Sequence, residues 1–162
     1  MPVVTSTKSS PRIDRTPQVV VCTDKPEYHP GSTITIIIRN ETDFPIWYFG
    51  GGERFWGLER LDSNDRWVEV NFSFPLSDPR TGTDVCSYVL YEPVAPTRLE
   101  AQGEIRAQWY LGNFCEWPLE PIGVPTSVPK PLAPGTYRIV FVFGESFDSL
   151  EQKAYSEPFN IR

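Results

Sequence analysis

The stretch Ser32-Thr-Ile-Thr-Ile-Ile-Ile-Arg-Asn40 decides the fold class of this chain of 162 residues. Its isoleucines at positions 34, 36 and 38 alternate with mostly polar residues. Because successive side chains on a strand point to opposite faces, this period of two predicts a strand with one buried face. A turn is predicted just before this strand, at Tyr28-His29-Pro30-Gly31, because proline fixes φ and glycine accepts a positive φ.

Similar short patterns extend along the rest of the chain. Further strands are expected at residues 18–23, 46–49, 56–61, 66–70, 86–91, 136–143 and 155–161, and within 97–111. The 17 prolines disfavour a helical bundle, and strand–helix–strand spacing does not occur. We therefore predict an all-β, antiparallel β-sandwich of about eight strands over residues 18–162, with a flexible Ser/Thr/Pro-rich tail at residues 1–17.

The charge balance of the chain disfavours two classes of partner. Lysine and arginine number 15 and aspartate and glutamate number 21, which gives a net charge of −6. A nucleic acid or an anionic membrane surface requires a basic face, so neither is expected as a partner. The longest apolar runs, such as 139–143, are far shorter than the ~20 residues of a membrane span, so no direct membrane insertion is expected.

The three cysteines bear on both stability and compartment. Cys22, Cys86 and Cys115 show no Cys-x-x-Cys spacing, which excludes a zinc ribbon or a thioredoxin-like site. We predict a Cys86–Cys115 disulfide, because both residues flank segments that resemble neighbouring strands. That bond favours an extracytoplasmic location, secreted or tethered at the cell surface, whereas three reduced cysteines would favour the cytoplasm. Residues 1–17 lack the apolar core of a signal peptide and resemble a linker.

The sequence gives little support for catalysis. His29 is the single histidine, and it is expected in a solvated turn. Every catalytic mechanism that needs a histidine would have to use it, which disfavours such mechanisms. Motifs of the GxGxxG, P-loop or GxSxG type do not occur. The Asp62–Asp65 stretch offers oxygen atoms, but it is typical of a hairpin turn. We predict a protein that is not an enzyme and has no cofactor and no metal site.

The aromatic residues make up 14% of the chain and supply the candidate binding residues. Because neighbouring strand residues face opposite ways, Trp47 and Tyr48 cannot both lie in the core. An outward cluster beside the Gly50–Gly52 loop could stack on sugars or contact another protein. The candidates are Trp47, Tyr48, Phe55, Trp56 and Trp117. The alternative is that the proline-rich segment 112–135 folds over these rings. Two other aromatic residues, Trp67 and Tyr137, are assigned to the core.

Several short motifs resemble those of stand-alone bacterial immunoglobulin-like domains. They are Pro30-Gly31-Ser-Thr-Ile-Thr-Ile with Arg39-Asn40, Leu58-Glu-Arg-Leu with Trp67-Val-Glu-Val70, Leu132-Ala-Pro-Gly-Thr-Tyr-Arg-Ile139, and Ser156-Glu-Pro-Phe-Asn-Ile161. The resemblance covers residues 18–162 and implies an immunoglobulin-like antiparallel β-sandwich. A looser likeness, through Asn40, Gly103-Glu104, Trp109 and the late Pro-Gly-Thr-Tyr, is to the BsuPI-type intracellular proteinase inhibitors.

These observations predict a non-catalytic structural or protein–protein interaction module of a bacterial extracytoplasmic protein or assembly. It would act through strand edges and the aromatic 46–56 region on another protein or a second copy of itself. Two alternatives remain. One is a carbohydrate-binding module that uses outward Trp47 or Trp56, and the other is a proteinase inhibitor.

Overall fold

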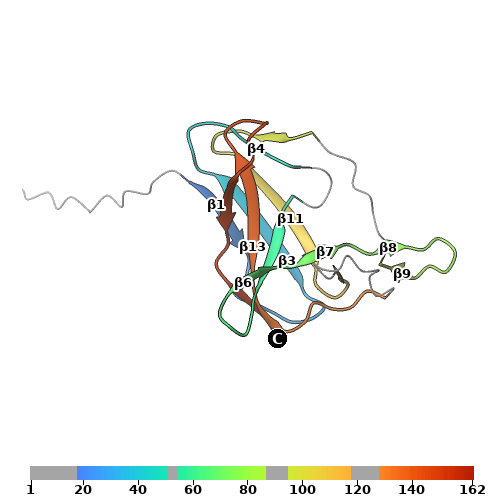
Figure 1. Cartoon of the computed structure of the whole chain (residues 1–162). Coiled ribbons are helices and arrows are strands. Elements are labelled where there is room, and N and C mark those ends of the chain that lie inside the picture. The colour runs from blue at the N-terminus through green and yellow to red at the C-terminus, as the bar shows by residue number, and fades with distance from the viewer. Residues whose placement is uncertain (1–17, 51–54, 87–94, 118–127) are drawn as a thin grey trace, which may run out of the picture.

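The fold is all-β, as predicted. The computed structural model describes residues 18–50, 55–86, 95–117 and 128–162, and these contain fifteen strands and no helix (Figure 1). The expected number, about eight, is lower because two long strands are interrupted, within residues 46–61 and 152–161, and because short strand pairs add to the count. The predicted tail at residues 1–17 lies outside the described residues.

The smaller of the two main sheets is built around the alternating stretch of residues 32–40. Its members are antiparallel neighbours in the order β1 (Val19–Thr23), β3 (Thr33–Asn40) and β11 (Glu104–Tyr110). Ile38 pairs with Val21 on one side and with Ile105 on the other. Alternation along β3 buries Ile34, Ile36 and Ile38 completely, as their period of two predicted.

The larger sheet is organised around β13 (Gly135–Gly144). Two broken strands flank it, one on each side: β4 (Ile46–Tyr48) with β5 (Gly57–Leu61), and β14 (Gln152–Tyr155) with β15 (Phe159–Ile161). The outer positions belong to β10 (Thr97–Leu99) beside β4, β6 (Trp67–Glu69) beside β5, and β2 (Glu27–Tyr28) beside β15. The β2–β15 pair is parallel and the other pairs are antiparallel.

Two short pairs complete the structure, namely β7 (Asn71–Ser73) with β12 (Cys115–Trp117), and β8 (Leu76–Ser77) with β9 (Asp84–Val85). Figure 1 shows the β8–β9 pair extending away from the main sheets. The Sγ atoms of Cys86 and Cys115 lie 2.08 Å apart, at disulfide distance, with 5.6 Å between the Cα atoms. Cys22 is a free thiol and is half-buried.

One hydrophobic core lies between the two main sheets. The isoleucines of β3 and the residues Tyr137, Ile139 and Phe141 of β13 are fully buried in it. The assignment of Tyr137 to the core is therefore correct. The assignment of Trp67 to the core is wrong, because this half-buried residue lies against the Arg138 guanidinium on the outer face of the larger sheet.

Asn40 ties the end of β3 to two neighbouring segments. The side chain is fully buried, and its Nδ2 donates to the backbone oxygens of Phe44, Leu99 and Glu100 at 2.9–3.3 Å. Its Oδ1 accepts hydrogen bonds from the amide and the hydroxyl of Thr42. One side chain thus satisfies polar groups that burial would otherwise leave without partners.

A second polar cluster joins the turn after β1 to β3 through Tyr28. The Tyr28 hydroxyl donates to Asp24 Oδ1 at 2.7 Å, and the same carboxylate oxygen accepts the Thr35 amide at 2.8 Å. Burial, together with the bond to Asp24, raises the pKa of Tyr28 from 10.0 to about 12. As the pH rises, the Tyr28 hydroxyl therefore loses its proton at a lower pH in the unfolded chain than in the folded protein.

The raised pKa of Tyr28 predicts a loss of stability in strong alkali. The free energy of unfolding is expected to hold below about pH 10 and to fall as pH rises from about 10 towards 12. Denaturant titrations across this interval measure the fall. The variant Tyr28→Phe is expected to show a smaller fall, and an alkaline slope equal to that of the wild type would contradict the assignment to Tyr28.

Candidate functional site

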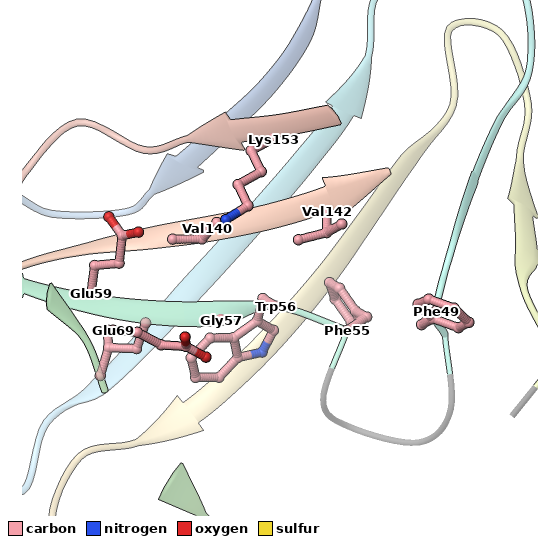
Figure 2. A pocket seen from close by; sticks show the side chains of 10 residues that line it. Phe49, Phe55, Trp56, Gly57, Glu59, Glu69, Val140, Val142 and Lys153 are labelled. Carbon is pink, nitrogen blue, oxygen red and sulfur yellow. The ribbon is translucent and has the colours of Figure 1, made fainter. Parts of the chain in front are cut away.

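Two hollows among the described residues bear on function, and the first is a pocket on the outer face of the larger sheet. This outer-face pocket encloses about 230 Å³ and is formed by β5, β6, β13, β14 and the ends of the loop between β4 and β5. Figure 2 shows Phe49 and Phe55 at one end, Glu59 and Glu69 at the opposite end, and Lys153 above β13. The pocket thus combines an aromatic end with a charged end.

Gly57 gives the outer-face pocket its depth. Gly57 pairs with Val140, at a position of β5 where any other residue would place a side chain beside the pocket. A Cβ atom at this position would lie 3.7 Å from the Val140 Cβ and 3.8 Å from its carbonyl oxygen, which are ordinary contacts. The hollow is therefore a consequence of one missing side chain and not of a strained backbone.

The charged end of the pocket is held in place by Arg138. Its Nε and Nη2 atoms lie 2.6 and 2.5 Å from Glu59 Oε2, and its guanidinium lies over the rings of Trp67 and Tyr155, at 4.3 and 4.0 Å from their centroids. Such stacking restricts the arginine and so orients the glutamate. Both bonds use the same carboxylate oxygen, and among the described residues none is made to Glu59 Oε1.

Two further charges stand at the rim without ion-pair partners among the described residues. Glu69 lies directly opposite Glu59 on the neighbouring strand, an arrangement of like charges that disfavours pairing of the two strands. Lys153 comes from β14 and is exposed. The rim therefore presents both signs of charge over a floor that contains Val140 and Val142.

The second hollow, the edge groove, lies between the outer strands of the two main sheets. It encloses about 660 Å³ between β1 and β14. Val21 and Phe143, which are almost fully buried, and the partly buried Val19 and Ala154 supply apolar lining. In the described part of the chain, β1 pairs with β3 alone and β14 with β13 alone. Each strand therefore has one edge without a backbone partner.

Hydrogen bonds at the strand ends show which backbone groups point into the edge groove. The Ser156 amide donates to the Ile139 carbonyl at 3.0 Å, so this pair is hydrogen-bonded. Because hydrogen-bonded pairs alternate along an antiparallel ladder, the amides and carbonyls of Lys153 and Tyr155 point away from β13. On β1, the Asp24 amide donates to the Thr35 carbonyl, so that pair is also hydrogen-bonded. By the same alternation, the amides and carbonyls of Val19 and Val21 point away from β3.

The candidate aromatic residues are distributed over several environments. Tyr48 is 7% exposed and packs against Phe55 and Phe141, and burial raises its pKa. Trp47 is half-buried and contacts Phe147 edge-on, so the two neighbours face opposite ways. Phe55, also half-buried, lines the outer-face pocket.

Trp56 and Trp117 do not form an outward cluster with these residues. Trp56 is 4% exposed, and its ring centroid lies 4.7 Å from that of Trp109, so the hypothesis that Trp56 faces outward is wrong. The half-buried Trp117 donates through Nε1 to Ser73 Oγ at 2.8 Å. The proposed covering segment 112–135 is described only outside residues 118–127, and its Phe114 is buried in the core against Trp109.

The described residues contain no group of three or more His, Cys, Asp or Glu side chains placed to hold a metal ion. They also contain no helix long and apolar enough to cross a membrane. Asp62 instead closes the β5–β6 turn, where its Oδ1 accepts the amides of Asn64 and Arg66.

Comparison with known proteins identifies no family for this chain. No protein-family model and no curated protein matches the sequence. Among solved structures, the chain is similar to Pseudomonas fluorescens alkylpurine DNA glycosylase AlkC bound to DNA containing an abasic site analog. The TM-score is 0.39 and the sequence identity 8%, over 91% of this chain and 31% of that chain. A likeness of this size carries no argument about fold or function.

Sequence reasoning missed most of what forms the two hollows. Glu59, Glu69 and Lys153 lie on separate strands, and their approach depends on the register of β5, β6 and β14. One usable signal was Gly57, because glycine within a strand often marks close approach of a ligand or another chain. The edge groove had no signal, since an unpaired edge is a property of the topology.

Proposed function

We propose that this protein is a non-catalytic interaction module with an immunoglobulin-like sandwich fold. The strand order supports the proposal, because the first segment divides between the sheets, with β1 beside β3 and β2 beside β15. A further support is Tyr137, near the start of β13, whose hydroxyl donates to the Ala133 carbonyl at 2.8 Å. Immunoglobulin-like domains carry such a tyrosine corner in the corresponding place.

The proposal includes a bacterial extracytoplasmic location. The Cys86 and Cys115 thiols at disulfide distance support it, because disulfides persist mainly in oxidising compartments. The resemblance of the strand motifs to bacterial immunoglobulin-like domains supports the bacterial part of the proposal.

The observation that carries the interaction role is the half-covered edge of the larger sheet. The Asn160 amide donates to the carbonyl of Pro26, just before β2, and the Arg162 amide donates to the carbonyl of Tyr28 in β2, so this segment covers the edge of β15. β2 begins at Glu27, opposite Asn160, and does not extend alongside β14, so the outward backbone groups of Lys153 and Tyr155 pair with no strand among the described residues. An extended segment of a partner protein placed in the edge groove would continue the row of β2 and form these bonds.

The groove also sets the chemistry of that segment. Alternate side chains of an added strand would point inward against Val21 and Phe143, so they are expected to be apolar. The remaining side chains would point outward, towards a rim that carries Glu145, Glu157 and Lys153. The partner segment is therefore an extended stretch in which apolar residues alternate with polar ones.

A proline substitution in β14 tests this role. Lys153→Pro removes the outward amide of Lys153 and leaves the bonds to β13 in place, which an edge strand tolerates. Peptides selected from a phage-displayed library of linear peptides against the wild type are expected to bind Lys153→Ala equally. They are expected to bind Lys153→Pro about tenfold more weakly, the effect of one lost hydrogen bond.

The measurement is a titration of the selected peptides by fluorescence anisotropy, with melting curves to verify folding of each variant. Failure to select any peptide would contradict the proposed role. Equal binding by folded Lys153→Pro and Lys153→Ala would also contradict it.

A further inference from the structure

We propose that the outer-face pocket binds one terminal pyranose ring of a glycan. This site is separate from the strand-accepting role of the edge groove and does not depend on it. It also differs from sugar stacking on an exposed tryptophan, since the pocket has Phe55 and Phe49 at its aromatic end and Trp56 is buried.

The size of the pocket restricts the ligand to a single ring. About 230 Å³ is smaller than the 300–1,000 Å³ of pockets that hold drug-sized ligands. A flat tryptophan platform, suited to the face of a long polysaccharide, is not part of this pocket, because Trp56, the tryptophan that lines it, is 4% exposed. A terminal sugar unit entering end-on fits these dimensions.

The charges at the rim favour a neutral ligand that both donates and accepts hydrogen bonds. A cationic ligand would meet Lys153, and an anionic ligand would meet Glu59 and Glu69. A sugar hydroxyl can donate to a carboxylate and accept from an ammonium group. Hydroxyls placed between Glu59 and Glu69 would also relieve the repulsion between these facing carboxylates.

The charged end of the pocket is already arranged to accept such a donor. Arg138 binds Glu59 through Oε2 and leaves Oε1 without a partner in the described structure. Because Arg138 is itself held between the Trp67 and Tyr155 rings, the carboxylate loses little freedom when a ligand binds.

The apolar surfaces complement the remaining face of a pyranose. Val140 and Val142 line the pocket, and Phe55 stands beside them (Figure 2). A pyranose ring presents C–H groups on one face and hydroxyls around its edge. The ring can therefore lie on the valines while its hydroxyls reach the charged residues.

A pocket-filling substitution tests the inference. Gly57→Leu places a side chain in the hollow at a position where a Cβ makes only ordinary contacts, so the variant is expected to fold. The probes are methyl glycosides of neutral hexoses. Their binding is measured in NMR titrations, through changes in the chemical shifts of the protein. At least one is expected to bind the wild type, with shifts at residues 57, 59 and 142, and to bind Gly57→Leu at least tenfold more weakly.

Two further variants and two competing ligands make the test specific. Glu69→Ala is expected to weaken binding, whereas Asp43→Ala removes an exposed carboxylate away from the pocket and is expected to leave binding unchanged. The absence of binding by every neutral hexoside would overturn the inference. Equal binding by folded Gly57→Leu, or preferential binding of arginine methyl ester or N-acetyl-tyrosinamide in the pocket, would overturn it as well.

Discussion

Replacing Asn40 with alanine is expected to lower the free energy of unfolding by about 3–4 kcal/mol, because it removes five hydrogen bonds from a buried site. The cost is large because the carbonyl of Leu99 and the amide of Thr42 lose a hydrogen-bond partner in buried positions, where water has little access. In a domain of this size the loss corresponds to a fall in Tm of about 10 °C.

Asn160→Ala is the matched control for Asn40→Ala. Asn160 is exposed on β15, and its Oδ1 accepts the Thr136 hydroxyl at 2.8 Å. Since water can replace this bond, the control is expected to change stability by about 0.5 kcal/mol or less. Urea unfolding followed by tryptophan fluorescence measures both variants, and similar effects at the two positions would contradict the role assigned to Asn40.

Removing the Cys86–Cys115 bond is expected to cost a similar amount. The bond closes a loop with a sequence separation of 29 residues, and chain entropy gives about 3–4 kcal/mol for a loop of this length. Cys86→Ala with Cys115→Ala is the appropriate double variant, because alanine adds no polar atom at the buried Cys115 site. Urea unfolding of the oxidised wild type and the variant measures the difference.

Cys22→Ala serves as the control, since Cys22 makes no bond to another cysteine. It is expected to have a much smaller effect than the double variant. Mass spectrometry without reduction should find one free thiol. Three free thiols would contradict the disulfide and remove the main support for an extracytoplasmic location.

The features that sequence predicted well are those determined by neighbouring residues. The alternation of residues 32–40 predicts β3, and the Asp62–Asp65 turn joins β5 and β6. The interruption of β4 and β5, and of β14 and β15, has no comparable local signal. It arises because both broken strands follow the single long strand β13.

The candidate site was harder to predict because it depends on which face of each strand lies inside. Alternation correctly required Trp47 and Tyr48 to face opposite ways, but it could not show that Tyr48 is the buried one. Trp67 was assigned to the core from its size alone. Its contact with Arg138 stabilises an outward position for a large aromatic ring.

Amide hydrogen exchange of β14 tests the proposed strand-accepting edge most directly. In the free protein, the amides of Lys153 and Tyr155 are expected to exchange rapidly, whereas that of Ala154, directed at β13, is expected to be protected. A bound peptide should slow the exchange of Lys153 and Tyr155. Slow exchange of these two amides in the free monomer, or exchange unchanged by a bound peptide, would contradict the account.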